Sequence, residues 1–130
     1  MARILVIEDN TVLRALVRGL LESQGYSVVE AANGAEGLQV YAAAPADLVI
    51  TDLEMPVLDG FQVLRALRHT APAAAVLAIS GDPHALVQAR TLTPYTLAKP
   101  LALQPLLATV QRLVAAPTPV PTSVGQGSDL

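Results

Sequence analysis

The sequence predicts a doubly wound α/β domain with a five-stranded parallel sheet and five helices. Short apolar runs alternate five times with longer segments that carry a helical apolar period, and this alternation is typical of βα units on a parallel sheet. The chain has 130 residues, which suits one domain, and 52% of them are hydrophobic, which is enough for one buried core. Polar residues directly follow several of the apolar runs, at the strand ends where open parallel sheets bind ligands.

The expected strands are short apolar runs bounded by turn residues or polar residues. The second strand is more polar than the others, which suits a position at an edge of the sheet. Each strand is followed by a segment long enough to cross back over the sheet as a helix. The expected strands cover residues 3–7, 27–31, 48–51, 75–79 and 96–98.

The first expected helix carries an apolar stripe at Leu13, Leu16, Val17 and Leu20, and Gly25 closes it as a C-cap residue. The other helices begin after turn or capping residues, and the second is weak, rich in alanine and stopped by a proline. The last has a regular buried side. These four expected helices cover residues 34–44, 61–68, 83–91 and 104–115.

The domain is expected to comprise residues 1–115, followed by a disordered tail or a linker at residues 116–130. This last segment has three prolines and no periodic apolar face. Such a composition buries too little surface to offset the entropy of ordering the chain. We therefore expect one folded domain and no second one.

Composition limits the classes of binding partner and the cellular compartment that we expect for this chain. The net charge is −3, and no run of lysines or arginines is present that would neutralise a nucleic acid backbone. The sequence has no cysteine, so it has neither a disulfide framework nor a thiolate metal site, and a cytoplasmic location is expected. The apolar runs are far shorter than the ~20 residues of a membrane helix. We expect neither direct nucleic acid binding nor membrane insertion.

Five ionisable or hydroxyl side chains follow the expected strands and should meet at one edge of the sheet. Glu8 and Asp9 follow the first strand, Asp52 the third, Ser80 the fourth and Lys99 the fifth. Three carboxylates placed together repel one another unless a cation joins them, and oxygen ligands suit Mg²⁺. Asp52 can then attack phosphorus, while Lys99 neutralises the arriving phosphoryl oxygens and Ser80 donates a hydrogen bond. The pattern predicts an acyl phosphate site.

The sequence resembles the response-regulator receiver family over about residues 3–115. Each motif is weak alone, but together they occur in register at successive strand ends. The resemblance implies a flavodoxin-like fold with strand order 2-1-3-4-5. The motifs are Ile7-Glu-Asp9, Asp52-Leu-Glu-Met-Pro56 with Asp59-Gly60, Ile79-Ser80, and Ala98-Lys-Pro100.

The same resemblance implies how the site is used and by which partners. Asp52 would accept a phosphoryl group from the phosphohistidine of a histidine kinase or a histidine phosphotransferase. Mg²⁺ would be held by Glu8, Asp9, Asp52 and the backbone carbonyl of Glu54. A downstream protein would bind the face formed by the fourth helix, the fifth strand and the fifth helix. The chain itself would be a monomer or a phosphorylation-dependent dimer. The chain would be a signalling switch, with no enzymatic activity beyond self-phosphorylation and self-dephosphorylation.

The expected switch region departs from the family pattern. Receivers usually have an aromatic residue three positions before the lysine, where this chain has Thr96, and Tyr95 stands one position earlier. A shift of one residue in a strand reverses the face of the side chain. Either Pro94 changes the local path so that Tyr95 substitutes, or the switch lacks its aromatic half.

Two further acids flank the expected phosphoryl site. Glu54 and Asp82 lie two residues beyond Asp52 and Ser80, respectively, and could modulate the lifetime of the phosphoryl group. Asp82 precedes a proline and is more typical of a helix N-cap. Glu54 is expected to pair with a cation, for which Lys99 is nearby, rather than to act as a general base.

Three other functions fit parts of the sequence. Asp52-Leu-Glu54 resembles the Asp-x-Asp motif of haloacid dehalogenase-type phosphatases, but that family has its nucleophile after the first strand and usually a cap domain. A flavodoxin-like FMN binder would have hydroxyls and glycines after the first strand, where this chain has Glu8 and Asp9. A pseudo-receiver that binds a partner without phosphorylation is the third alternative.

Overall fold

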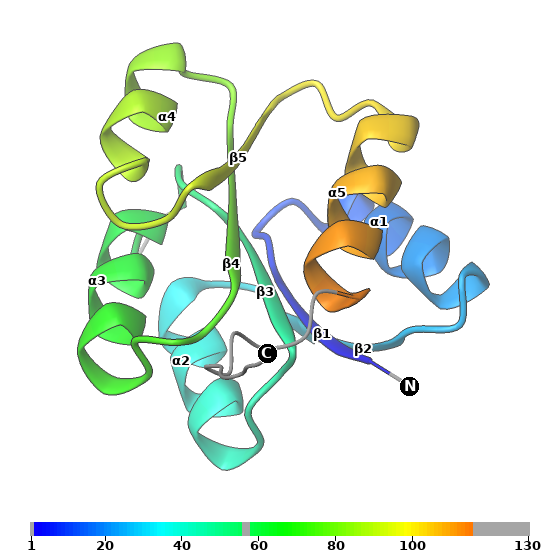
Figure 1. The fold of residues 1–130 in the computed structure, drawn as a ribbon, viewed down its shortest axis with the longest axis horizontal. Helices are drawn as coiled ribbons and strands as arrows, with labels where there is room; N and C mark the ends of the chain where they lie inside the picture. Colours follow the sequence, from blue (N-terminus) through cyan, green and yellow to red (C-terminus); the bar gives the residue numbers. More distant parts are fainter. Residues whose placement is uncertain (1, 56–57, 116–130) are drawn as a thin grey trace, which may run out of the picture.

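A single parallel sheet with the order β2-β1-β3-β4-β5 organises the fold, as the family resemblance implied (Figure 1). The structure is a computed structural model, and it describes residues 2–55 and 58–115. Every neighbouring pair of strands in it is parallel. The strands are β1 (Arg3–Ile7), β2 (Ser27–Ala31), β3 (Leu48–Asp52), β4 (Val76–Ser80) and β5 (Tyr95–Ala98).

Helices cover both faces of the sheet, which confirms the doubly wound architecture. Figure 1 shows α1 and α5 on one face and α2, α3 and α4 on the other. The predicted tail or linker at residues 116–130 lies outside the described residues. The helices are α1 (Thr11–Ser23), α2 (Gly34–Ala43), α3 (Gly60–Thr70), α4 (Pro83–Ala89) and α5 (Leu103–Ala115).

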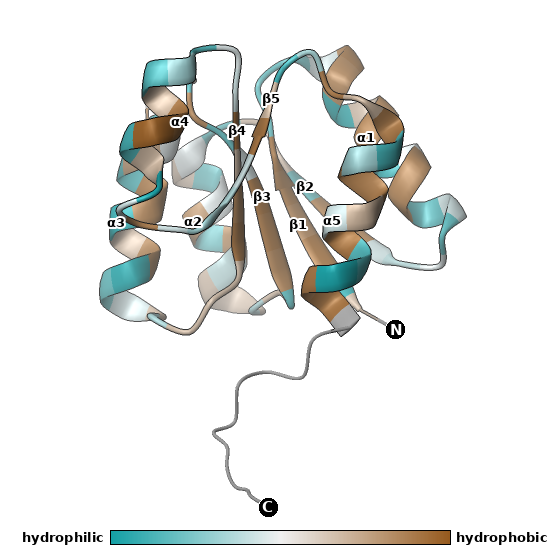
Figure 2. Ribbon diagram, turned by 45° about the horizontal axis from the view of Figure 1, so that its top comes forward, coloured by the Kyte–Doolittle hydropathy of each residue, from teal (hydrophilic) through white to brown (hydrophobic). Residues whose placement is uncertain are grey.

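The inner strands are apolar along their whole length because both of their faces are covered. In β1, Ile4 and Val6 point into the core shared with α1 and α5, whereas Leu5 and Ile7 point into the core shared with α2, α3 and α4. Figure 2 shows the resulting hydrophobic colour of β1, β3 and β4. This two-sided burial explains why these strands read as continuous apolar runs instead of alternating ones.

Side chains at the helix ends determine where the helices begin. Four helices start after a residue whose side-chain oxygen accepts a backbone N–H of the first turn; these residues are Asn10, Asn33, Asp59 and Asp82. The predicted N-cap role of Asp82 is therefore confirmed. Gly25, with φ at 91°, follows α1 and donates its N–H to the carbonyl of Glu22, as expected for a glycine that ends a helix.

The predicted apolar stripe of α1 was wrong at one position. Leu16 is 54% exposed, while Val17 and Leu21 are buried against the sheet. Residues four apart lie one above the other on a helix, so a stripe centred on Val17 and Leu21 leaves Leu16 at its margin. There Leu16 lines a groove of about 300 Å³ together with Leu103 of α5.

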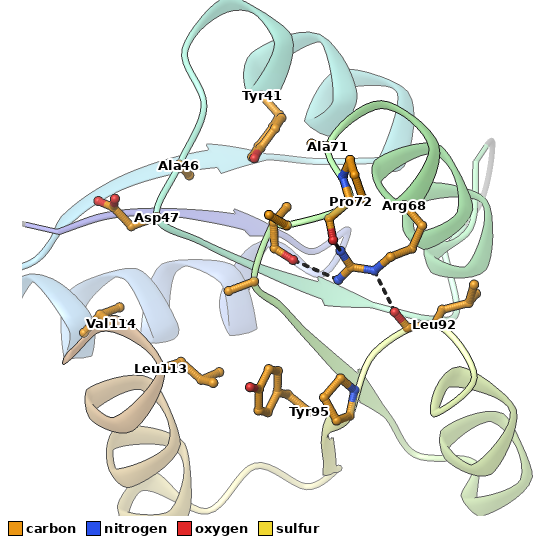
Figure 3. A pocket seen from close by; sticks show the side chains of 14 residues that line it. Tyr41, Ala46, Asp47, Arg68, Ala71, Pro72, Leu92, Tyr95, Leu113 and Val114 are labelled. Atoms are coloured by element: carbon orange, nitrogen blue, oxygen red, sulfur yellow. Dashed lines mark hydrogen bonds between the residues drawn. The ribbon is translucent and has the colours of Figure 1, made fainter. Parts of the chain in front are cut away.

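A cavity of about 770 Å³ lies beside the amino ends of β3, β4 and β5 (Figure 3). Arg68 of α3 lines this cavity and links the segments around it. Its guanidinium donates hydrogen bonds to the carbonyls of Leu92, Pro72 and Ala74 at 2.7, 2.8 and 2.8 Å. The candidate site described below lies at the opposite edge of the sheet. Over residues 2–55 and 58–115, no helix is long and apolar enough to cross a membrane.

Candidate functional site

The strand register brings the predicted site residues to one edge of the sheet. Asp52 is the last residue of β3 and pairs with Ile79, and Ser80 is the last residue of β4 and pairs with Ala98. Lys99 follows β5 directly, and its backbone N–H donates to the carbonyl of Ser80 at 2.9 Å. Strand order reverses between β1 and β3, which is where open α/β sheets place ligands.

Three carboxylates form the centre of this edge. Glu8, Asp9 and Asp52 each have a carboxylate oxygen within 4.8 Å of the others. Glu8 and Asp52 are only 5% and 4% exposed, whereas Asp9 is exposed. Burial raises the pKa of Glu8; the backbone N–H of Asn10 lowers that pKa, and the charge of Asp52 raises it further. Burial and the neighbouring Asp52 thus disfavour the charged form of Glu8.

Lys99 partly neutralises this cluster. Its Nζ lies 3.2 Å from Oε1 of Glu8 and 3.2 Å from Oδ2 of Asp52. Burial of the ammonium opposes its charge, but attraction to Asp52 and Glu8 outweighs burial, so the pKa of Lys99 is raised. Lys99 therefore carries its positive charge at neutral pH and connects the ends of β1, β3 and β5.

The remaining charge of the cluster fits a hard divalent cation. Three ionised carboxylates and one ammonium leave two negative charges on this group. Its donors are all oxygen atoms, and Mg²⁺ prefers a few carboxylate ligands while it retains several waters. The exposed position of Asp9 leaves one side of the cluster open to solvent. Glu8, Asp9 and Asp52 are thus suited to hold Mg²⁺.

Ser80 and Glu54 form a direct contact beside Asp52. Ser80 Oγ donates to Oε2 of Glu54 at 2.6 Å and accepts the N–H of Asp82 at 2.9 Å. The N–H of Glu54 in turn donates to Oδ1 of Asp52 at 3.3 Å. The expected pairing of Glu54 with Lys99 was wrong in this respect: the Glu54 carboxylate accepts from Ser80, and Lys99 contacts Glu8 and Asp52.

Tyr95 does not take the place of the aromatic residue expected at Thr96. Tyr95 pairs with Leu77 and packs on the face covered by α1 and α5, near Leu113 (Figure 3). Thr96 pairs with Ala78, which belongs to the core on the opposite face. The strand keeps its regular alternation, so a change of path at Pro94 does not bring Tyr95 to the other face.

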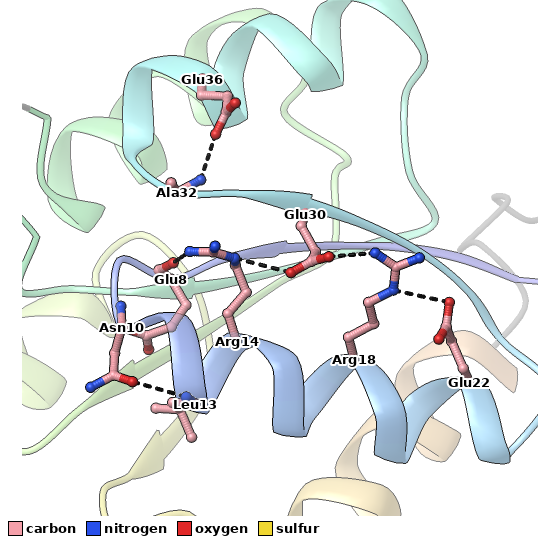
Figure 4. Close-up of polar contacts among 9 residues, drawn as sticks. All are labelled: Glu8, Asn10, Leu13, Arg14, Arg18, Glu22, Glu30, Ala32 and Glu36. Carbon is pink, nitrogen blue, oxygen red and sulfur yellow. Dashed lines mark hydrogen bonds and ion pairs between the residues drawn. The ribbon is translucent and has the colours of Figure 1, made fainter.

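Two further residues support the site, and sequence reasoning missed one of them, Arg14. Arg14 donates from Nη1 to the backbone carbonyl of Glu8 at 2.7 Å and from Nε to Glu30 at 3.0 Å (Figure 4). Gly60 packs so closely that a Cβ there would lie 2.2 Å from the carbonyl oxygen of Asp52. The Asp59-Gly60 motif was a signal for the glycine, whereas Arg14 stands in an ordinary helical pattern.

Comparison with known proteins identifies a family. The family model described as the response regulator receiver domain matches residues 4–111. The response regulator MprA of Mycolicibacterium vanbaalenii is 36% identical over 120 residues, which cover 90% of this chain and 52% of that protein. The autoinducer 1 sensor kinase/phosphatase LuxN of Vibrio campbellii is 33% identical over 79 residues, covering 61% of this chain and 9% of LuxN. The chain thus spans about half the length of MprA.

Solved structures agree with this assignment. The crystal structure of a response regulator receiver domain protein from Clostridium thermocellum superposes with a TM-score of 0.82 at 31% sequence identity. The superposition covers 88% of this chain and 95% of that one. The matching family model is that of a receiver domain, so it supports neither the haloacid dehalogenase-type phosphatase nor the FMN binder considered as alternatives. The chain belongs to the response-regulator receiver family of two-component signalling systems.

Proposed function

We propose that Asp52 accepts a phosphoryl group from the phosphohistidine of a histidine kinase or a histidine phosphotransferase. The observation that carries this proposal is the buried Asp52 carboxylate, 4% exposed, whose Oδ2 lies 3.2 Å from Lys99 Nζ within the acidic cluster. A carboxylate held at a strand end beside a fixed cation is suited to attack phosphorus.

The transfer exchanges one bond to phosphorus for another. An Oδ atom of Asp52 forms the new O–P bond while the P–N bond to the donor imidazole breaks. The electron pair of that bond stays on the imidazole nitrogen, which takes up a proton from water. Lys99, which already contacts Asp52, then faces the new phosphoryl oxygens and stabilises their charge.

The same proposal includes a Mg²⁺ site. Glu8, Asp9 and Asp52, together with the backbone carbonyl of Glu54, would hold the ion. When bound, Mg²⁺ supplies positive charge that shields the incoming phosphoryl group from the carboxylates. Arg14 steadies the Glu8 end of this ligand set through the Glu8 carbonyl.

Downstream signalling would use the face formed by α4, β5 and α5. Val87 of α4 is 59% exposed, so this helix offers an apolar side chain to a partner protein. The phosphorylated chain would act as a monomer or as a dimer, which light scattering before and after phosphorylation distinguishes. The cytoplasmic location expected from the sequence is part of this proposal, as is the absence of enzymatic activity beyond self-phosphorylation and self-dephosphorylation.

Incubation with acetyl phosphate and Mg²⁺, followed by intact mass spectrometry, tests the proposed function. We expect the mass increase of one phosphoryl group in the wild-type chain and none in Asp52→Asn. Labelling should also be lost in EDTA. A wild-type chain that stays unlabelled would favour the pseudo-receiver alternative, and a labelled Asp52→Asn variant would assign the acceptor to another residue.

A further inference from the structure

The hydroxyl of Ser80 already has hydrogen-bond partners in the unphosphorylated chain. Ser80 is 0% exposed, so its polar atoms must find their partners within the protein. Its proton is donated to Oε2 of Glu54 at 2.6 Å, while a second acceptor, the backbone carbonyl of Asp82, lies farther away at 3.4 Å. The Ser80 oxygen accepts the N–H of Asp82 at 2.9 Å. Because a serine hydroxyl has only one proton to donate, the same hydroxyl cannot also donate to a phosphoryl oxygen on Asp52.

We propose that Glu54 is a positioning residue that holds the Ser80 proton and thereby competes with the phosphoryl group on Asp52 for it. This inference rests on the proposed function. We call the contact between the Glu54 carboxylate and the Ser80 hydroxyl the hydroxyl latch. Phosphorylation would then require the latch to open, so the latch favours the unphosphorylated state.

The surroundings restrict how the latch can open. The carbonyl of Ser80 accepts the N–H of Lys99 at 2.9 Å, and the N–H of Glu54 donates to Oδ1 of Asp52 at 3.3 Å. Both backbones are therefore tied to the site, so the Glu54–Ser80 contact opens through movement of the two side chains. The released hydroxyl can then turn to another acceptor, such as the Asp82 carbonyl at 3.4 Å. Glu54 is exposed, so its carboxylate can move into water once Ser80 releases it.

A carboxylate is a stronger acceptor than a neutral oxygen, so the competition should be measurable. Glu54→Ala removes the acceptor and leaves the Glu54 backbone carbonyl in place for a metal ion. Glu54→Gln keeps an oxygen acceptor but removes the charge, so its effect should lie between those of wild type and Glu54→Ala. Simple charge repulsion predicts instead that the two variants behave alike.

A double-mutant cycle with beryllofluoride as the phosphoryl mimic tests the latch. Its affinity in Mg²⁺ would be measured by ¹⁹F NMR for wild type, Glu54→Ala, Ser80→Ala and the double variant. We expect Glu54→Ala to raise the affinity about tenfold when Ser80 is present, and by less than about threefold in the Ser80→Ala background. Circular dichroism of each variant verifies that it folds.

Asp59→Asn is the matched control. Asp59 lines the same groove as Glu54, and asparagine retains its N-cap role in α3. This variant removes one negative charge without touching Ser80, and its effect should be the same in both Ser80 backgrounds. Equal effects of Glu54→Ala in the two backgrounds would overturn the latch and leave only charge repulsion.

A second measurement separates failure of the latch from failure of the proposed function. Without any phosphoryl donor, the backbone amide NMR signal of Asp82 should shift in Glu54→Ala, because the Ser80 hydroxyl that it contacts is released. An unchanged Asp82 signal would overturn the latch even if Asp52 is phosphorylated normally. A wild-type chain that takes neither beryllofluoride nor phosphate would overturn the proposed function, and the inference with it.

Discussion

Gly60 supports Asp52 from behind, where any side chain would displace the backbone. A Cβ at this position would lie 2.2 Å from the carbonyl oxygen of Asp52 and 2.7 Å from Cα of Leu53. Both neighbours are main-chain atoms, so rotation of a side chain cannot relieve the contact. We expect Gly60→Ala to lower the free energy of unfolding by about 1–3 kcal/mol and to slow phosphorylation, as measured by urea denaturation and intact mass.

Gly19 provides the control for that substitution. It lies within α1, and a Cβ there would have no neighbour within 4 Å. Alanine is the better helix former, so Gly19→Ala should raise stability by about 0.5–1 kcal/mol and leave phosphorylation unchanged. Equal stability of the two alanine variants would contradict the close packing at Gly60.

Asp9 and Lys99 should differ in their effects on Mg²⁺ affinity. Asp9 offers a carboxylate oxygen to the cluster, whereas Lys99 contributes a competing positive charge 3.2 Å from Glu8 and Asp52. Asp9→Ala should weaken Mg²⁺ binding by roughly tenfold or more, and Lys99→Ala should leave it unchanged or tighten it. A calorimetric titration in which Lys99→Ala loses more affinity than Asp9→Ala would contradict these roles.

At the residue scale, sequence predicted the members of the site better than their contacts. Asp52, Ser80 and Lys99 were found because each follows an apolar strand, and parallel strands bring their carboxyl ends to one edge. The contact of Glu54 with Ser80 was missed. Glu54 lies in the loop after β3, and the direction of its side chain depends on the path of that loop, which an apolar pattern does not reveal. The same limit applied to Arg14.

Strand β2 is joined to α1 by a chain of charges. The carboxylate of Glu30 accepts hydrogen bonds from Arg14 and Arg18, and Arg18 also pairs with Glu22 within α1 (Figure 4). The hydrogen bond from Arg18 is the main cause of a lowered pKa for Glu30, with Arg14 contributing further. The network thus anchors the edge strand and, through Arg14, reaches the carbonyl of Glu8.

A lowered pKa of Glu30 in the folded chain has a defined consequence for pH dependence. Folding favours the ionised form of Glu30. Its contribution to stability is present above the ordinary glutamate pKa of 4.5 and is lost as the pH falls through the lower pKa of the folded chain. Glu30→Gln should therefore destabilise the chain at pH 7. Both ion pairs of Glu30 reach the surface, so the loss should be less than about 1 kcal/mol. The difference between the two chains should vanish below the lowered pKa of Glu30. Urea denaturation across pH measures it, and a difference that grows on acidification would contradict the assignment.

Arg68 ties α3 to the loops at the amino ends of β4 and β5. Its guanidinium donates to three backbone carbonyls, those of Leu92, Pro72 and Ala74 (Figure 3). Arg68→Ala leaves these acceptors without a charged donor and should lower the free energy of unfolding by about 2–3 kcal/mol. Phosphorylation of the folded fraction should persist, because the acidic cluster lies at the other edge of the sheet.

Arg65 is the matched control for Arg68. It lies on the same helix, is exposed, and stacks over Phe61 with its guanidinium carbon 6.0 Å from the ring centre. Arg65→Ala should change stability by less than about 1 kcal/mol. If both variants unfold at the same urea concentration, the carbonyl contacts of Arg68 contribute little.

At the element scale, strand and helix types followed from apolar periodicity, and most ends agreed to within one or two residues. The differences arise where tertiary contacts decide. In α1, Val17 and Leu21 are the residues buried in the core, and Leu16 instead lines a groove with Leu103 of α5. Apolar periodicity shows which residues share one side of a helix. It does not show which residues at the border of that side are covered by a neighbouring helix.

At the scale of the whole molecule, the strand order positions the chemistry. Alternation of strands and helices predicted a parallel sheet with two covered faces, but it does not state which strands are neighbours. The order came from the family resemblance, and the structure confirms it. With β1 beside β3, the carboxylates of Glu8 and Asp52 lie at the reversal of strand order, and β4 and β5 add Ser80 and Lys99.

Mapping the phosphoryl group along the chain tests the central claim most directly. After incubation with acetyl phosphate and Mg²⁺, borohydride reduces an aspartyl phosphate to homoserine, and tandem mass spectrometry of peptides locates it. We expect homoserine at position 52 alone, and none when EDTA is present. Homoserine at position 9, a phosphoryl group that survives on another residue, or an unmodified Asp52 in a fully labelled sample would contradict the account.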